Sequence, residues 1–175
     1  MEIANGLKHL KGGGSSEISM IVESDDGGYV AVGYFLREVN WENEVTLVNE
    51  GSSTGDGMII KYNAEGNAEW AKIIGGKGDE NSDIINSITK ADDGGYIIAG
   101  YFESPSIDLG NGIILKNKYP IKDSNGYYPK YGVIVKYNSD GEAEWGKVIG
   151  DEDGGRYSSS DDTIIRAITK TSDGG

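Results

Sequence analysis

The stretch Asp93-Gly-Gly-Tyr-Ile-Ile-Ala-Gly-Tyr-Phe102 decides the fold, because it occurs earlier as Asp26-Gly-Gly-Tyr-Val-Ala-Val-Gly-Tyr-Phe35. The Asp-Gly-Gly motif occurs a third time at residues 173–175. Two further stretches between these turns also occur twice: Met58–Asn63 as Val133–Asn138, and Ala68–Gly75 as Ala143–Gly150. The recurrence of these stretches in the same order indicates a repeat architecture, in which each unit buries its apolar surface against its neighbours.

Each repeat is expected to hold four main antiparallel strands. In the second unit, β-branched runs separated by Gly, Asn and Asp turns predict strands at residues 84–90, 96–102, 133–137 and 142–149. A small hairpin is expected at 106–115, and its counterpart in the first unit at 39–47. No segment keeps a helical apolar period for three turns. Four antiparallel strands with an inserted hairpin are typical of a propeller blade.

The predicted fold is therefore all-β, with propeller-like repeats of four-stranded antiparallel blades in a single domain over residues 1–175. The units span about 18–83 and 84–162, with a partial third unit at 163–175 and a leading strand at 5–11. A propeller ring needs about four to eight blades. Two blades cannot close a ring, so we expect either a piece of a longer protein, which is the favoured interpretation, or a partner in an assembly.

Charge and composition exclude several classes of function. The formal net charge is −13, which disfavours nucleic acid and anionic membrane as partners because phosphate is repelled. No apolar run is long enough for a transmembrane helix, so membrane insertion is not expected. The chain has no cysteine and a single histidine, His9, which excludes thiol chemistry and any site built on several histidines of one chain.

The spacing of the repeats separates a constant frame from variable loops. Trp70 and Trp145 lie 75 residues apart, as do Lys61 and Lys136. The span from Asp26 to Lys61 is 35 residues, whereas the matching span in the second unit is 43, so a loop has gained eight residues. Binding sites usually lie in such variable loops on a repeated frame.

These residues resemble the bacterial β-propeller repeat often called SBBP, which occurs in large secreted and surface proteins. The resemblance covers roughly residues 5 to 175, with the best matches at Asp93–Tyr96, Ile107–Gly110, Val133–Asn138 and Trp145. The first unit departs from the pattern where Asn40-Trp-Glu42 replaces the Asp-hydrophobe-Gly motif. The resemblance implies a propeller and an extracellular or cell-surface location, and it carries no catalytic residue.

The insert 116–131 of the second unit is the predicted binding surface. It gathers lysines and tyrosines on an otherwise acidic molecule, and tyrosine is enriched where loops recognise partners. The alternative is a long loop that folds on its own aromatic side chains. Trp41 is added from the first unit, with cross-strand packing as its alternative role. The predicted ligand-binding residues are Trp41, Tyr119, Lys122, Tyr127, Tyr128, Lys130 and Tyr131.

Two other patterns favour structural roles. Trp70 and Trp145 recur at a fixed spacing, which indicates packing between blades and disfavours a stacking platform for sugars. Acidic loops at 78–83 and 151–162 offer oxygen ligands for calcium. Asp79, Asn81 and Asp83 begin like an EF-hand loop, but Ile84 and Lys90 stand where glycine and glutamate are needed. Solvated turns are the favoured interpretation, so no cofactor is expected, with calcium as the alternative.

The sequence thus predicts a non-enzymatic module for extracellular recognition or adhesion. Its expected partner is a carbohydrate or a surface protein, besides other blades of a longer chain or self-association through the terminal strands. A purely structural spacer is the main alternative, and a polysaccharide hydrolase is a weaker one, since 29 acidic residues allow many carboxylate pairs. No residue is singled out as catalytic.

Overall fold

The computed structural model describes residues 14–40, 45–49, 54–76, 81–118, 128–150 and 162–171. These residues form strands and turns and no helix, which confirms the all-β prediction. The strands are β1 (Ser16–Glu23), β2 (Tyr29–Phe35), β3 (Glu38–Asn40), β4 (Thr46–Val48), β5 (Asp56–Tyr62), β6 (Ala68–Ile74), β7 (Asp83–Lys90), β8 (Tyr96–Phe102), β9 (Ser106–Asp108), β10 (Ile114–Lys116), β11 (Tyr131–Tyr137) and β12 (Ala143–Ile149).

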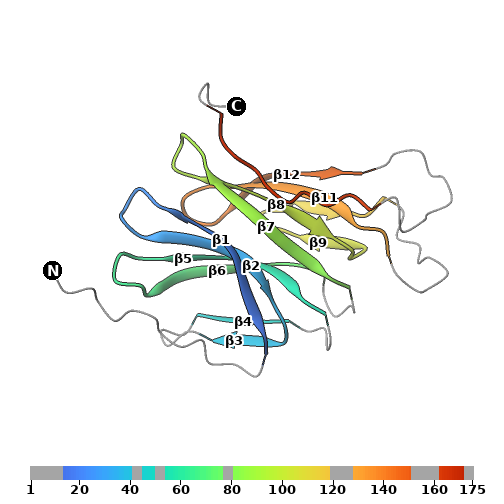
Figure 1. Ribbon diagram of the computed structural model, residues 1–175, viewed down its shortest axis with the longest axis horizontal. Coiled ribbons are helices and arrows are strands. Elements are labelled where there is room, and N and C mark those ends of the chain that lie inside the picture. Colours follow the sequence, from blue (N-terminus) through green and yellow to red (C-terminus); the bar gives the residue numbers. More distant parts are fainter. Residues whose placement is uncertain are drawn as a thin grey trace.

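The main strands form two four-stranded antiparallel sheets with the same order (Figure 1). The first sheet has the order β1-β2-β5-β6 and the second β7-β8-β11-β12. The small hairpins β3–β4 and β9–β10 are inserted between the second and third main strands of their units. Four antiparallel strands and one inserted hairpin per repeat are therefore confirmed.

The two sheets also share their irregularities. The register shifts at Ile18/Met20 in β1 and at Ile85/Ser87 in β7, which are equivalent places in the first strand of each sheet. A bulge of this kind adds one residue and offsets the alternation of side chains. As a result Ile85 and Ile88, three positions apart, are both fully buried in the core between the sheets.

The sheets are stacked face to face through β7. This strand pairs with β8 and lies against β1, β2 and β5 of the first sheet (Figure 1). Gly57 of β5 makes room for it, since a Cβ there would lie 2.9 Å from Ile85 Cγ1. The core between the sheets joins Val30 and Ile59 of the first sheet with Tyr96 and Val133 of the second.

The opposite face of the first sheet has its own apolar cluster. Phe35, Met58 and Ile60 of the main strands pack there with Val39 and Leu47 of the β3–β4 hairpin. Burial of apolar surface contributes roughly 25 cal/mol per Å². The inserted hairpin thus covers a sheet face that would otherwise meet water.

Residues 162–171 hold the place of a further first strand. The sequence predicts a strand at 163–170, but the segment forms no ladder with any described strand. It lies on the second sheet as β7 lies on the first: Thr163 N donates to Lys130 O at 2.8 Å, and Asp83 N donates to Gly55 O at 2.9 Å. The predicted leading strand 5–11 lies outside the described residues. The described sheets close no ring.

Substitution of Gly57 tests the stacking contact. We expect Gly57→Ala to lower the free energy of unfolding by ~1–3 kcal/mol, because the new methyl group overlaps Ile85 and backbone of β6 in a packed core. Gly132→Ala is the matched change in the second sheet, where the nearest atoms at 3.1 Å are side chains of Thr163 and Ile165. Urea unfolding should show a smaller loss for Gly132→Ala, and equal losses would contradict this account.

Candidate functional site

The candidate site lies at the end of each sheet where the Asp-Gly-Gly turns occur. The carboxylate Oδ1 of Asp26 accepts a hydrogen bond from Gly28 N at 3.0 Å, and that of Asp93 accepts one from Gly95 N at 2.9 Å. Gly27 and Gly94 have φ near +80°, a conformation in which glycine carries no steric penalty. Each aspartate is therefore held in a fixed position by its own turn.

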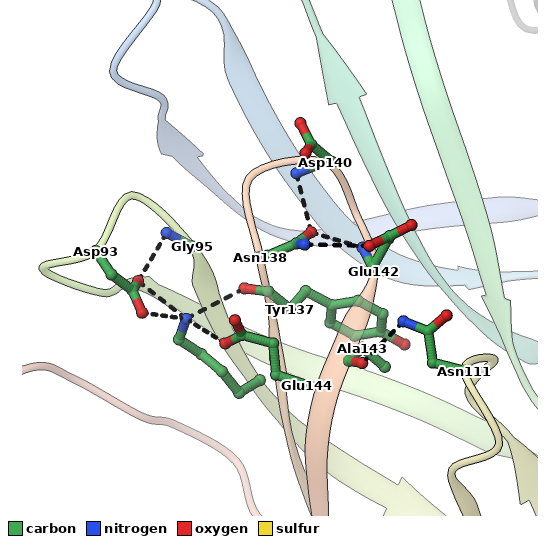
Figure 2. Close-up of polar contacts among 10 residues, drawn as sticks. Asp93, Gly95, Asn111, Tyr137, Asn138, Asp140, Glu142, Ala143 and Glu144 are labelled. Carbon is green, nitrogen blue, oxygen red and sulfur yellow. Dashed lines mark hydrogen bonds and ion pairs between the residues drawn. The ribbon is translucent and has the colours of Figure 1, made fainter.

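A buried lysine from the third main strand reaches each of these aspartates. Figure 2 shows the contacts of the second unit, around Asp93. Lys136 Nζ donates to both carboxylate oxygens of Asp93, at 2.9 and 2.8 Å, and to Glu144 Oε2 at 3.0 Å. Lys61 Nζ donates likewise to Asp26 Oδ2 at 2.7 Å and to Glu69 Oε2 at 2.9 Å. We call these groups the lysine clusters, Lys61–Asp26–Glu69 and Lys136–Asp93–Glu144.

In each lysine cluster the lysine and the aspartate stabilise one another in their charged forms. Burial lowers the pKa of Lys136, but its hydrogen bonds to Asp93 and Glu144 outweigh burial and raise that pKa above its ordinary value. The hydrogen bond from Lys136, followed by that from Gly95, holds the pKa of Asp93 below its usual range. A general base or a nucleophilic lysine needs a pKa near the working pH. The clusters therefore have the chemistry of structural ion pairs.

The polar contacts around the second cluster continue this structural pattern (Figure 2). Asn138 Oδ1 accepts hydrogen bonds from Asp140 N at 3.0 Å and Glu142 N at 2.9 Å, which closes the turn before β12. Asn111 Nδ2 donates to Ala143 O at 3.2 Å and attaches the turn of the β9–β10 hairpin to β12. The Tyr137 hydroxyl is buried without a partner among the described residues, and burial raises its pKa.

A pocket of about 380 Å³ opens beside the second lysine cluster. Its charged side chains are ion-paired: Lys170 with Asp92 and Lys136 with Asp93 within the lining, and Lys90 with Asp25 of the first unit. The pocket lining therefore combines the apolar side chains of Ala91, Ile97 and Ile168 with ion-paired charges. The lining residues are Thr89, Lys90, Ala91, Asp92, Asp93, Ile97, Lys136, Ile168, Thr169 and Lys170.

The predicted binding residues are only partly within the described chain. Trp41, Tyr119, Lys122 and Tyr127 lie outside the described residues, so their role stays a prediction. Tyr128 is half-buried at the start of the segment that leads into β11.

Lys130 and Tyr131 have packing and ion-pair contacts. Lys130 Nζ lies 3.1 Å from Asp162 and 3.4 Å from Glu103, and 5.8 Å from the ring centroid of Tyr101. Tyr131 is 6% exposed, belongs to the core between the sheets and packs on Phe102 with ring centroids 6.3 Å apart. In the structure these two side chains contact intramolecular partners, and their role in ligand binding stays a prediction.

The tryptophans at the repeat position of the frame lie at the stacking surface. The turn at Gly141 packs on Trp70, because a Cβ at Gly141 would lie 2.8 Å from the indole ring. This contact joins the second unit to the first and agrees with the packing interpretation. Trp145, the equivalent residue of the second sheet, is 40% exposed.

Asp83 is a buried carboxylate that the sequence placed in a possible calcium loop. Its oxygens accept hydrogen bonds from Ser104 Oγ at 2.5 Å, Gly76 N at 2.9 Å and Glu103 N at 2.9 Å. These donors occupy the lone pairs that calcium would need. Over the described ranges, no group of three or more Asp, Glu, His or Cys side chains has the arrangement of a metal site. Asp79 lies outside those ranges.

Comparisons with known proteins do not assign the chain to a family. No protein-family model matches the sequence, and no curated protein matches it. Across the described residues, there is no helix with the length and apolar character needed to cross a membrane.

Substitution of Asp93 tests the lysine cluster. Asp93→Ala removes the turn acceptor and one partner of a buried lysine, so we expect a loss in unfolding free energy on the order of 1 kcal/mol or more. Asp93→Asn keeps an acceptor for Gly95 N and should lose less. Asp140→Ala, an exposed residue, is the control. Urea denaturation that ranks all three variants equally would contradict a structural role for the cluster.

The pH dependence of stability tests the burial of Asp83. Burial raises the pKa of Asp83 to about 6 from an ordinary 3.8, although its hydrogen bonds act in the opposite direction. The folded protein then binds this proton more tightly than the unfolded chain, so the Asp83 contribution is greatest below about pH 4 and is lost as the pH rises through about 6. Relative to Asp83→Asn, the unmodified protein should lose unfolding free energy between pH 4 and 7. A difference that does not change with pH would contradict the raised pKa.

Proposed function

We propose that the chain is a non-enzymatic recognition module built from stacked β-repeats. The observation that supports it is a contrast between the two units. The frame makes the same contacts twice, including the lysine clusters and the stacking of a first strand over a glycine. The insert 116–131 has no counterpart of equal length in the first unit. We therefore expect ligand binding in the insert, where the two units differ, and a structural role for the frame that they share.

The chemistry of the frame supports a role without catalysis. The lysine clusters and Asp83 are held by hydrogen bonds within the fold, and each carboxylate or ammonium group in them already has partners. Groups used in this way stabilise the sheets and their connections. Recognition through tyrosine and lysine side chains of a loop needs no such reactive group.

The proposed partner is an extracellular carbohydrate, with a surface protein as the alternative class. We further propose that the two sheets are blades of a propeller of the SBBP type, acting outside the cell or at its surface. The shared strand order and the repeated stacking contact support this proposal. A purely structural spacer would use the same frame and would bind no ligand.

Binding to a polysaccharide panel tests the recognition role. The double substitution Tyr127→Ala/Tyr128→Ala should weaken binding at least about tenfold, since aromatic faces supply much of the contact energy in such sites. Truncation of the half-buried Tyr128 should cost only a small part of the stability, so the thermal midpoint should fall far less than the affinity does. Trp145→Ala is the control, because it removes an exposed aromatic residue of the frame, and it should keep binding.

Other outcomes would overturn the proposal in different ways. Absence of binding to any glycan or surface-protein extract would favour the spacer. Loss of binding in Trp145→Ala, with binding kept by the tyrosine double variant, would place the binding site on the second sheet and not in the insert. Cleavage of a polysaccharide that a single Asp or Glu substitution abolishes would identify a hydrolase.

A further inference from the structure

Equivalent residues of the two sheets differ in exposure in a consistent way. On the face of the first sheet that meets the second, Val30 and Ile59 are fully buried, whereas their equivalents Ile97 and Ile134 are half-buried. At the other end of the stack, β1 carries Ile18 at 43% and Ile21 at 55% exposure. The equivalents of these two residues in β7, Ile85 and Ile88, are fully buried. Each end thus presents half of the interface that joins the two sheets.

The pocket on the second sheet is equivalent to the place that a tyrosine side chain, Tyr96, occupies between the two sheets. In the interface between the sheets, Tyr96 is 2% exposed and interacts with Lys61, Asp26 and Ser24. The pocket is lined by Lys136, Asp93 and Ala91, which are the equivalents of those three residues. Tyr29 is the equivalent of Tyr96 and is 45% exposed. Tyr29 of one molecule could therefore fill the pocket of another in the way that Tyr96 fills the equivalent place beside Lys61.

The segment 163–170 already lies where the first strand of an incoming sheet belongs. Lys170 pairs with Asp92 on the second sheet as Lys90 pairs with Asp25 on the first. β1 has Glu23 at this repeat position. If β1 lay on the second sheet, Glu23 would approach Asp92, and like charges in contact are destabilising. Segment 163–170 is therefore the first strand that fits this surface.

We propose that copies of this chain associate head to tail, with the first sheet of one copy stacked on the second sheet of another. In this contact, segment 163–170 of one copy pairs with the edge of β2 of the next and takes the place of β1. The register of β1 and β2 then puts Lys170 opposite Tyr29, and Ile164 opposite Tyr34. Tyr29 of the incoming copy enters the pocket beside Lys136.

The exchange keeps the number of paired strands in each first sheet and adds buried apolar surface. The side chains of β1 are mostly exposed, and the packing that its departure removes, Val22 on the core and the contacts with β7, lies where segment 163–170 of the other copy enters. The backbone bonds that β1 makes with β2 are replaced by those of segment 163–170, which now forms no ladder within the described chain. The contact joins two different surfaces, the outer face of the first sheet and the outer face of the second. Each added copy therefore leaves one surface of each kind unoccupied, and such contacts form a growing chain of molecules or close into a ring.

Light scattering behind a sizing column tests association of the full chain. The mean mass should rise with concentration above that of the 18.7 kDa monomer. Tyr29→Ala should weaken association about tenfold, which corresponds to loss of one buried aromatic contact. Its urea midpoint under dilute, monomeric conditions should stay unchanged because Tyr29 is exposed there. A mass that stays monomeric at every concentration overturns the proposal.

Engineered disulfides test the strand exchange, since the chain has no cysteine of its own. Ile164→Cys/Tyr34→Cys should form crosslinks between molecules, seen as a ladder on a non-reducing gel. The matched variant Glu17→Cys/Tyr34→Cys fixes β1 on β2 within one molecule, because Glu17 pairs with Tyr34. When oxidised it should remain monomeric, and when reduced it should associate. Association by the oxidised control, or absence of the ladder in an associating sample, would overturn the exchange.

Discussion

The rest of the structure depends on one constraint: each four-stranded sheet has two apolar faces, and both must be covered. In the first sheet, Val30 and Ile59 point to one face and Phe35 and Met58 to the other. The second sheet covers the first of these faces and the β3–β4 hairpin contributes to covering the second. No sheet of this kind is stable alone in water, so stacking is a condition of folding.

The lysine clusters continue this packing at the ends of the sheets, where buried strands meet polar turns. A lysine in a buried strand packs its aliphatic stem against the neighbouring sheet while its ammonium group reaches the polar end. Lys61 and Lys136 each join three places in their unit: the Asp-Gly-Gly turn, the third strand and the fourth strand through Glu69 or Glu144. Breaking such a pair leaves a buried charge, so the three places keep a fixed geometry.

The local features of the fold could be predicted from the sequence, because hairpins depend on neighbouring residues. The turn glycines and the β-branched runs predicted β8 at its observed limits and β9 and β10 within two residues. The buried position of Tyr131 also had a signal, since it alternates with Val133 and Val135 in one strand. The ion pair of Lys130 with Asp162 joins residues 32 positions apart, and no local pattern reports it. Segment 163–170 has the sequence of a first strand, yet a ladder needs a partner strand that the sequence pattern of one segment does not supply.

The stacking is directional, and this decides where the units are free to differ. Each inserted hairpin lies beside the fourth strand of its own unit, as the contacts of β4 with β6 and of β10 with β12 show. Leu109 and Leu115 approach Gly146 there, so the hairpin itself is fixed by packing. The chain between β10 and β11 begins and ends at contacts that both units share, since Asn117 Nδ2 donates to Pro129 O as Asn49 Nδ2 donates to Thr54 O. Between these two points the second unit has the longer chain, so residues can be added there without changing the frame. A directional stack therefore places the segment between the hairpin and the third main strand at the same position in each unit, where its length can vary while the packing of the frame is kept.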